Sequence, residues 1–356
     1  MTTISRMPET NRKVTIGVDT HCDVNVAAAL DEHGRLLETQ SFPTSAAGHR
    51  ELERWAMSLG TILALGIEGT GAYGVGLTRH LTLRGHQIFE VDRPNRQTRY
   101  RRGKSDTVDA EAAARAVLSG TATGQPKRRD GKVEAIRALR VSRRSALKAR
   151  NQTINQMRCL IASAPEEIRE RLRGLSRHAF AGVCARFRVC GVNSAADASK
   201  YALRSLARRY EYLTTEIQEL DSQLEPLLKS VCPELMQIRG VGPDVAGQLL
   251  VTAGENPERL RSESAFAHLC GVAPIPVASG RTDRVRLNRG GDRQANAALY
   301  RVILNRLRWD GKTIAYCERR TAEGRSKKEI IRCLKRYVAR EVFPVLQKAG
   351  KGLDNA

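Results

Sequence analysis

The chain has 356 residues, a length typical of two or three domains that each bury a hydrophobic core. Its 60 lysines and arginines outnumber 38 acidic residues, and the formal charge of +22 favours a polyanion such as nucleic acid over a merely solvated basic surface. No apolar run reaches the roughly 18 residues of a membrane span, and residues 1–8 lack the apolar core of a signal peptide, which predicts a cytoplasmic protein with no membrane partner. The eight cysteines contain no Cys-x-x-Cys pair, which excludes a zinc knuckle and a disulfide framework.

Residues 1–125 have the pattern of an α/β domain. Three β-rich runs come first, joined by short turns as in a three-strand meander, at residues 14–20, 24–30 and 35–42. Helix and strand patterns then alternate, with a helix at 46–58, a strand ending at Glu68, a helix at 74–84, a strand at 87–91 and a helix that carries Asp106 and Asp109. The order βββαβαβα is that of the RNase-H-like (RuvC-like) fold, in which carboxylates gather at the ends of the first and fourth strands and on a late helix. We therefore expect an RNase-H-like catalytic domain here.

Four acidic residues of this segment have the positions of metal ligands. Asp19 ends one apolar, β-branched run, and Glu68 ends another. Asp106 and Asp109 are three residues apart in a sequence of strong helix propensity, so they share one face of a helix. Hard divalent cations prefer oxygen-rich pockets, and paired metals recur in sites that cut phosphodiester bonds. The four carboxylates thus predict a Mg²⁺ (or Mn²⁺) site.

Residues 126–232 have the pattern of long helices. One helix is expected over residues 130–162, where apolar residues recur at helical spacing, and a second over residues 196–230. Two long helices around an irregular tip predict an antiparallel coiled-coil arm or a dimerisation surface. A plain packed helical bundle is the alternative that the residues leave open.

Residues 233–356 are predicted to form a mainly α-helical domain. The stretch Gly240-Val241-Gly242 stands between an apolar residue and a helix start, as in the turn of a helix-hairpin-helix, whose glycines let backbone amides approach a phosphate. A purely structural hairpin fits the same pattern. A polar, glycine-rich loop is expected over residues 278–292, followed by helices at 294–308, 311–321 and 327–347.

Basic residues are clustered along the chain. Residues 93–104 hold six basic and no acidic side chains directly before the Asp106 helix, and residues 127–150 hold ten basic and two acidic ones on an expected helix. A solvated face is the alternative, but these positions favour phosphate contacts. Aromatic residues make up only 4% of the chain, so backbone and shape recognition of duplexes is expected rather than base stacking. The candidate nucleic-acid-binding residues are Arg93, Arg96, Arg99, Arg101, Arg102, Lys104, Arg140, Arg143, Arg144, Gly240, Gly242, Arg281, Arg284, Arg286, Arg289 and Arg293.

Ser279 lies in the glycine-rich loop and is followed within fourteen residues by five arginines. A serine before a glycine is usually a turn residue. Arginines in this number can hold a phosphate and stabilise developing negative charge, and a serine hydroxyl with such help, plus a base or a metal, can act as a nucleophile. From the residues alone both interpretations stay open.

Four motifs resemble those of a known family. They are Gly-Val-Asp-Thr-His at Asp19, Glu-Gly-Thr-Gly-Ala-Tyr-Gly at Glu68, Lys-Ser-Asp-Thr-Val-Asp-Ala-Glu-Ala at Asp106 and Asp109, and Ala-Ser-Gly at Ser279 followed by Arg-Leu-Asn-Arg-Gly-Gly-Asp-Arg-Gln-Ala-Asn. In this order, and over almost the whole chain, they are similar to the DEDD-type transposases of insertion sequence family 110, also called bridge-RNA-guided recombinases. The resemblance implies a catalytic domain at residues 1–125, a long-helix linker at 126–232 and a C-terminal transposase domain at 233–356.

The resemblance also implies a composite active site. Asp19, Glu68, Asp106 and Asp109 would bind Mg²⁺, and Ser279 would attack the scissile phosphate to give a phosphoserine link and a free 3′-hydroxyl. The implied partners are donor and target double-stranded DNA and a structured guide (bridge) RNA, bound by a homodimer or a dimer of dimers at the prokaryotic nucleoid, with base pairing supplying the sequence information. The alternative is a Holliday-junction-type endonuclease that uses water and does not need Ser279. A catalytically silent nucleic-acid-binding protein is the third possibility.

Overall fold

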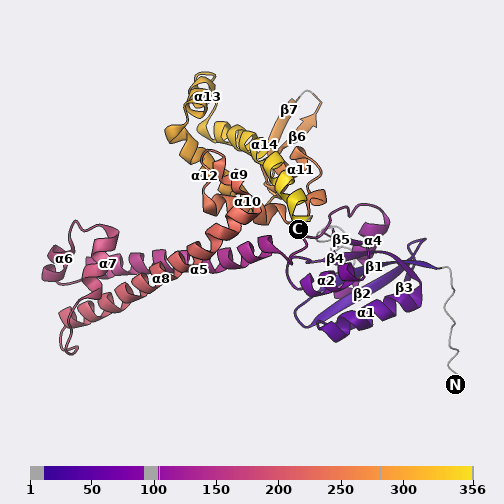
Figure 1. The fold of residues 1–356 in the computed structure, drawn as a ribbon, viewed down its shortest axis with the longest axis horizontal. Coiled ribbons are helices and arrows are strands. Elements are labelled where there is room, and N and C mark those ends of the chain that lie inside the picture. Colours follow the sequence, from indigo (N-terminus) through magenta and orange to yellow (C-terminus); the bar gives the residue numbers. More distant parts are fainter. Residues whose placement is uncertain (1–11, 92–102, 104, 281, 355–356) are drawn as a thin grey trace. The chain divides into compact units, whose positions relative to one another are not determined.

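The computed structural model describes residues 12–91, 103, 105–280 and 282–354 (Figure 1). The chain divides into two compact units, Met1–Arg129 with Gly254–Arg261, and Asp130–Ala253 with Ser262–Ala356. None of the helices in these described ranges is long and apolar enough to cross a membrane.

The first unit is built on a five-stranded mixed sheet. Its strands lie in the order β3-β2-β1-β4-β5, where β1, β2 and β3 are antiparallel neighbours and β1, β4 and β5 are parallel neighbours. The strands are β1 (Lys13–Thr20), β2 (Val24–Asp31), β3 (Leu36–Pro43), β4 (Thr61–Glu68) and β5 (Ile88–Val91). The expectation of an α/β N-terminal domain is confirmed, with element bounds close to those predicted.

Helices pack on both faces of this sheet. Helices α1 (Ala46–Leu59) and α2 (Val75–Leu83) cover one face, where apolar residues of β1 such as Ile16 and Val18 pack against Leu52 and Leu77. Helix α4 (Asp106–Leu118) covers the other face, where Ala110 packs against alternate residues of β2. Because side chains alternate along a strand, each strand of the sheet's centre supplies both layers of the core.

Helix α4 lies unusually close to the central strands because two glycines face it. A Cβ atom at Gly17 would stand 2.1 Å from the Ala110 carbonyl oxygen, and one at Gly66 would stand 2.8 Å from the Ala113 carbonyl oxygen. These distances are too short for any side chain at either position. The helix backbone therefore rests directly on the sheet, with the start of α4 at the end of the sheet where β1 and β4 finish.

The second unit begins with a pair of long helices. Helix α5 (Lys132–Ala162) and helix α8 (Ala195–Val231) lie side by side and run antiparallel, since Arg143 reaches Asp221 while Arg150 reaches Tyr210 (Figure 1). The end of the pair was expected to be irregular. It instead contains α6 (Glu166–Leu172) and α7 (Arg177–Ala185), whose apolar residues Ile168 and Phe180 complete a local core with both long helices.

The rest of this unit is mainly helical, as predicted. The helices are α9 (Pro233–Gln237), α10 (Pro243–Ala253), α11 (Glu263–Leu269), α12 (Arg293–Trp309), α13 (Gly311–Ala322) and α14 (Lys327–Asp354), and a short 3₁₀ turn at Pro257–Arg259 belongs to the first unit. The expected loop over 278–292 is partly wrong. Strands β6 (Pro274–Ser279) and β7 (Thr282–Leu287) form a hairpin in register from Pro274↔Leu287 to Ser279↔Thr282, and Gly280 begins its turn with a φ of 53°.

The close packing of α4 on the sheet yields a testable prediction. Gly17→Ala should lower the free energy of unfolding by about 1–3 kcal/mol, because its Cβ meets backbone atoms of α4 that cannot move without displacing the helix. Denaturant unfolding monitored by circular dichroism measures this. The matched control is Gly311→Ala, where a Cβ meets nothing within 4 Å and stability should be unchanged or slightly higher. Equal stabilities of the two variants would contradict the close contact.

Candidate functional site

Two of the four predicted carboxylates stand at the ends of neighbouring parallel strands. Asp19 lies near the end of β1, and Glu68 is the last residue of β4. The register pairs Val18 with Ile67, so the next residues along the two strands are Asp19 and Glu68. Each acid follows a glycine that faces α4 by two positions, and residues two apart on a strand share a face. Both carboxylates are therefore on the α4 side of the sheet.

The other two carboxylates lie in the first turn of α4. The Ser105 hydroxyl accepts a hydrogen bond from the Val108 amide and caps the helix, which fixes Asp106 as its first residue. Asp109 is buried, with 3% of its surface exposed, whereas Asp106 is exposed. The start of the helix carries positive partial charge, which favours carboxylates there.

A histidine joins this cluster. The His21 Nε2 atom lies 3.2 Å from Asp19 Oδ2 and 3.4 Å from Asp106 Oδ1. One ligand atom from each of these three residues lies within 4.8 Å of the others, a spacing that suits one shared cation. Sequence reasoning assigned no role to His21, although the Asp-x-His spacing directly after a strand was a signal for it.

The pKa of Asp19 reflects its burial and the charged groups around it. Burial raises the pKa of the Asp19 carboxyl above its ordinary value; the neighbouring His21 opposes this shift, while Asp109 and Asp106 add to it by like-charge repulsion. Three of the predicted acids therefore act on one another, and the strand register places Glu68 beside them. Converging carboxylates, of which Asp19 is buried and has a raised pKa, fit a hard divalent cation.

The predicted nucleic-acid contacts are distributed over both units. Seven of them lie outside the described residues, and they are Arg93, Arg96, Arg99, Arg101, Arg102, Lys104 and Arg281. The backbone of Arg284 belongs to β7. Arg286, Arg289 and Arg293 are exposed.

Arg140 and Arg143 were expected to bind phosphate, but both form ion pairs within the protein. Arg140 Nη1 lies 2.8 Å from Asp244 Oδ1, its Nη2 donates to Gln248 Oε1 at 3.1 Å, and Arg143 pairs with Asp221. Both guanidinium groups are largely buried in this packing of α5 against α8 and α10, which weakens the prediction for them. Arg144 is exposed, and a phosphate contact there stays a prediction.

The two glycines of the predicted helix-hairpin-helix turn differ in surroundings. Gly240 has a φ of 83°, and its Cα faces α12, where a Cβ would stand 3.2 Å from the Val302 carbonyl oxygen. A Cβ at Gly242 would meet nothing within 4 Å. Only the second glycine therefore has open space beside it.

Ser279 is the last residue of β6 and is exposed at the tip of the hairpin. It belongs to the second unit, whereas the four carboxylates belong to the first. A hydroxyl at an exposed hairpin tip is open to a large substrate.

Comparison with known proteins matches both units to transposases. A family profile for DEDD-type IS110 transposases, described as "Transposase", matches residues 16–164, and the "Transposase IS116/IS110/IS902 family" profile matches residues 232–318. The chain belongs to the IS110 family of transposases. The first match contains the four carboxylates and the second contains Ser279, so this transposase carries every predicted catalytic residue within a family-matched segment.

Two relatives of this transposase come from insertion sequences. The "Transposase for insertion sequence element IS1328" of Yersinia enterocolitica is 23% identical over 248 residues, which cover 67% of this chain and 70% of the relative. The "Insertion element IS900 uncharacterized 42 kDa protein" of Mycobacterium paratuberculosis is 26% identical over 134 residues, 37% of this chain and 34% of that protein. Family and relatives support an enzyme of DNA transposition.

The raised pKa of Asp19 predicts an unusual stability effect. The folded protein holds the Asp19 proton to a higher pH than the unfolded chain does, so ionisation of this carboxyl costs stability as the pH rises through the folded pKa. Without divalent metal, Asp19→Asn should therefore melt at a higher temperature than the wild type at pH 7, and this difference should shrink toward pH 4. Calorimetric scans in a chelator measure it.

The same variant should bind Mn²⁺ roughly tenfold or more weakly, because one ligand of the proposed site is lost. Glu32→Gln, which removes a charge from an exposed turn, is the matched control and should change neither property. A lower melting temperature for Asp19→Asn at pH 7, with unchanged Mn²⁺ affinity, would contradict the site.

Proposed function

We propose that this transposase cuts and rejoins DNA strands of its insertion sequence, using Mg²⁺ (or Mn²⁺) held by Asp19, Glu68, Asp106 and Asp109 and Ser279 as the nucleophile. The observation that carries the proposal is the shared space of Asp19, His21 and Asp106, with Asp109 in the same electrostatic field. A divalent ion bound there would act as a Lewis acid on the phosphoryl oxygens.

Two finer features of the fold belong to this proposal. We propose that the first unit is RNase-H-like, which is supported by the order β3-β2-β1-β4-β5, its two antiparallel and two parallel pairs of neighbouring strands, and carboxylates at the ends of β1 and β4. We also propose that α9, the turn at Gly240 and α10 form a helix-hairpin-helix, with the open side at Gly242 facing a phosphate.

The chemistry assigned to Ser279 conserves bond energy. Its oxygen attacks the scissile phosphorus, a phosphoserine ester forms, and the bond to the 3′ oxygen breaks, so the 3′ oxygen leaves with a proton as a free hydroxyl. The exposed Arg286, Arg289 and Arg293 that follow the serine supply positive charge for the developing negative charge of the phosphate. Because the ester retains the energy of the broken bond, the strand can be rejoined to a new partner without an external energy source.

The partners follow the same proposal. A structured guide RNA would pair with donor and target DNA and supply the sequence information, while the protein, with its net charge of +22, would hold the backbones. The carboxylates and Ser279 lie in different units, which supports a composite site shared between the protomers of a homodimer or a dimer of dimers.

One observation favours a second candidate, a metal-dependent junction endonuclease that uses water. His21 lies within the carboxylate cluster, where an imidazole can take a proton from an attacking water. That enzyme would not need Ser279.

The two functions differ in the outcome of one experiment. Ser279→Ala should lower strand cleavage by roughly 10³-fold or more and abolish recombination, because the nucleophile is lost. Labelled donor and target DNA, guide RNA and Mg²⁺ are mixed with each protein and analysed by denaturing electrophoresis. A DNA-linked protein band is expected for the wild type and for the control Ser222→Ala, which removes an exposed hydroxyl on α8. Normal cleavage by Ser279→Ala, with no adduct for any protein, would support the endonuclease instead.

A further inference from the structure

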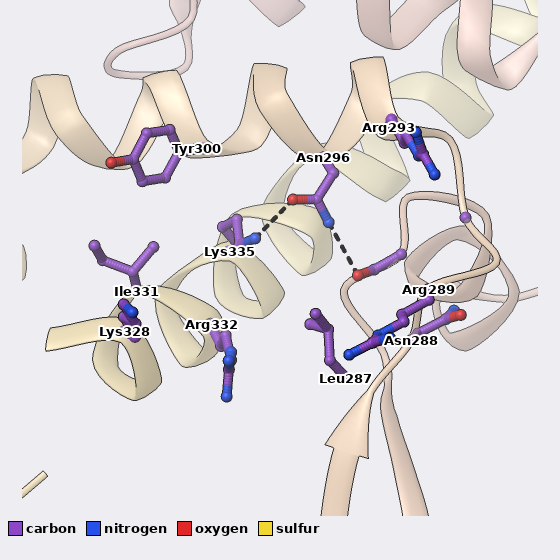
Figure 2. Close-up of a pocket in the computed structure, with 12 residues that line it drawn as sticks. Leu287, Asn288, Arg289, Arg293, Asn296, Tyr300, Lys328, Ile331, Arg332 and Lys335 are labelled. Carbon is purple, nitrogen blue, oxygen red and sulfur yellow. Dashed lines mark hydrogen bonds between the residues drawn. The ribbon is translucent and has the colours of Figure 1, made fainter. Parts of the chain in front are cut away.

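A cavity of about 470 Å³ lies where the β6–β7 hairpin joins α12 and α14 (Figure 2). Its walls come from residues just before β6, the end of β7 and the segment after it, and the facing sides of the two helices. Five of the residues that line it are basic, and none is acidic. The five are Arg289, Arg293, Lys328, Arg332 and Lys335.

The most informative of these cations is Lys335, because it is buried. Only 8% of its surface is exposed, and its Nζ donates a hydrogen bond of 2.7 Å to Asn296 Oδ1, a neutral acceptor. No ion pair of Lys335 with a carboxylate occurs among the described residues. Burial lowers the pKa of the Lys335 ammonium, and the nearby Arg332 lowers it further. A buried cation without a carboxylate is costly to the fold, so a site that keeps one is suited to an anion from outside.

The cavity is held in shape by contacts around it. Asn296 Nδ2 donates to the carbonyl oxygens of Cys270, at 3.1 Å, and Gly271, at 3.0 Å. These bonds turn Asn296 Oδ1 toward Lys335, to which Figure 2 shows it hydrogen-bonded. A Cβ at Gly291 would stand 2.2 Å from the Gly271 amide nitrogen, so the two backbone segments touch.

Asp292, an acidic residue that adjoins this wall, is bound to other groups. Asp292 Oδ1 accepts from the Gln294 amide at 2.8 Å, and its Oδ2 accepts from the Thr252 hydroxyl at 2.7 Å. Its carboxylate is thus engaged in capping α12 and in tying that helix to α10.

We propose that this cavity binds a phosphodiester group of a nucleic-acid strand, with Lys335 as the buried anchor and Arg332 and Lys328 at its mouth. The inference rests on the proposed function and names a contact within it. The volume suits one nucleotide unit, and Leu287, Ile331 and Tyr300 provide an apolar side for its sugar or base. DNA and RNA share the phosphodiester, and either strand can be the source.

The cavity lies at the base of the hairpin that carries Ser279, so a phosphate bound there would position nucleic acid relative to that serine. Strand β6 leads from the base of the hairpin to Ser279 at its tip, a length of about 17 Å for its five residue steps. A phosphate held at the base of the hairpin therefore fixes its nucleic-acid strand at a set distance from Ser279. This strand is either the one that is cut or a neighbouring one in the same complex. In a duplex this distance corresponds to about five nucleotide steps.

The first test compares Lys335→Met with Lys229→Met, which removes one positive charge from the exposed face of α8. Affinities of the full-length proteins for duplex DNA, single-stranded DNA and single-stranded RNA are measured at one salt concentration by fluorescence anisotropy. Lys335→Met should bind at least one of these probes about tenfold or more weakly than the wild type, and the weakened probe identifies the source of the phosphate. The control should stay within about twofold.

A second readout separates binding from a structural role. Without nucleic acid, Lys335→Met should melt at the same or a higher temperature than the wild type, because a buried, unpaired cation is replaced by an apolar side chain of similar length. If this variant is instead less stable, Lys328→Met at the exposed mouth takes its place in the binding measurement.

A single neutral methylphosphonate moved along the weakened probe locates the contact. At the position that fills the cavity, the neutral group should lower the affinity of the wild type. It should cause no further loss of affinity in Lys335→Met, because the methylphosphonate and the substitution remove the same interaction. Affinities of Lys335→Met and Lys328→Met equal to that of Lys229→Met for all three probes would overturn the cavity proposal. If Lys335→Met loses affinity as expected but no Ser279-dependent DNA adduct forms, the cavity proposal stands and the proposed reaction is refuted. Failure of the cavity proposal and failure of the proposed function are therefore distinguishable.

Discussion

The candidate site depends on the direct backbone contact of α4 with the central strands β1 and β4. Gly17 and Gly66 remove the side chains that would hold the helix away, and backbone then meets backbone. As a result, Asp106 and Asp109 in the first turn of the helix reach the side of the sheet where β1 and β4 present Asp19 and Glu68. The arrangement brings like charges together, and the pKa of Asp19 is raised by burial first and by the neighbouring Asp109 and Asp106 in addition. A bound cation, as proposed, would offset this cost.

The two units hold concentrated charge of opposite sign. In the first, carboxylates converge with one exposed histidine among them. In the second, a cavity collects five cations around a buried lysine whose partner is neutral. In our proposals a divalent metal binds at the first site and a phosphodiester binds at the second, and an enzyme that exchanges DNA strands uses both. Two arginines of α5 behave differently, since Arg140 and Arg143 form ion pairs with Asp244 and Asp221 and stabilise the packing of α5 against α8 and α10.

The sequence predicted the features that depend on local pattern. Period-two runs located the strands, helical spacing located α5 and α8, and the strand-end positions of Asp19 and Glu68 placed those acids correctly beside each other. Features that depend on contacts distant along the chain were missed. Asp244 lies about a hundred residues from Arg140, so nothing local indicated their ion pair. The β6–β7 hairpin was hidden by its polar, glycine-rich composition, and the Lys335 cavity required Asn296 and α14 to be brought together by the fold. His21 was missed although its Asp-x-His spacing after the first strand was a local signal for it.

The most direct test of the central claim is an anomalous diffraction experiment on crystals of the wild type grown with Mn²⁺. The proposal predicts a strong anomalous peak between Asp19 and Asp106, with oxygen atoms of Asp19, Asp106 and Asp109 at roughly 2.1–2.2 Å from the metal and Glu68 within the same ligand shell. Crystals of Asp19→Asn should lose the peak while keeping the position of α4. Well-ordered wild-type carboxylates with no anomalous density among them at saturating Mn²⁺, and with His21 still bridging Asp19 and Asp106, would contradict the claim that the seat of α4 builds a metal centre.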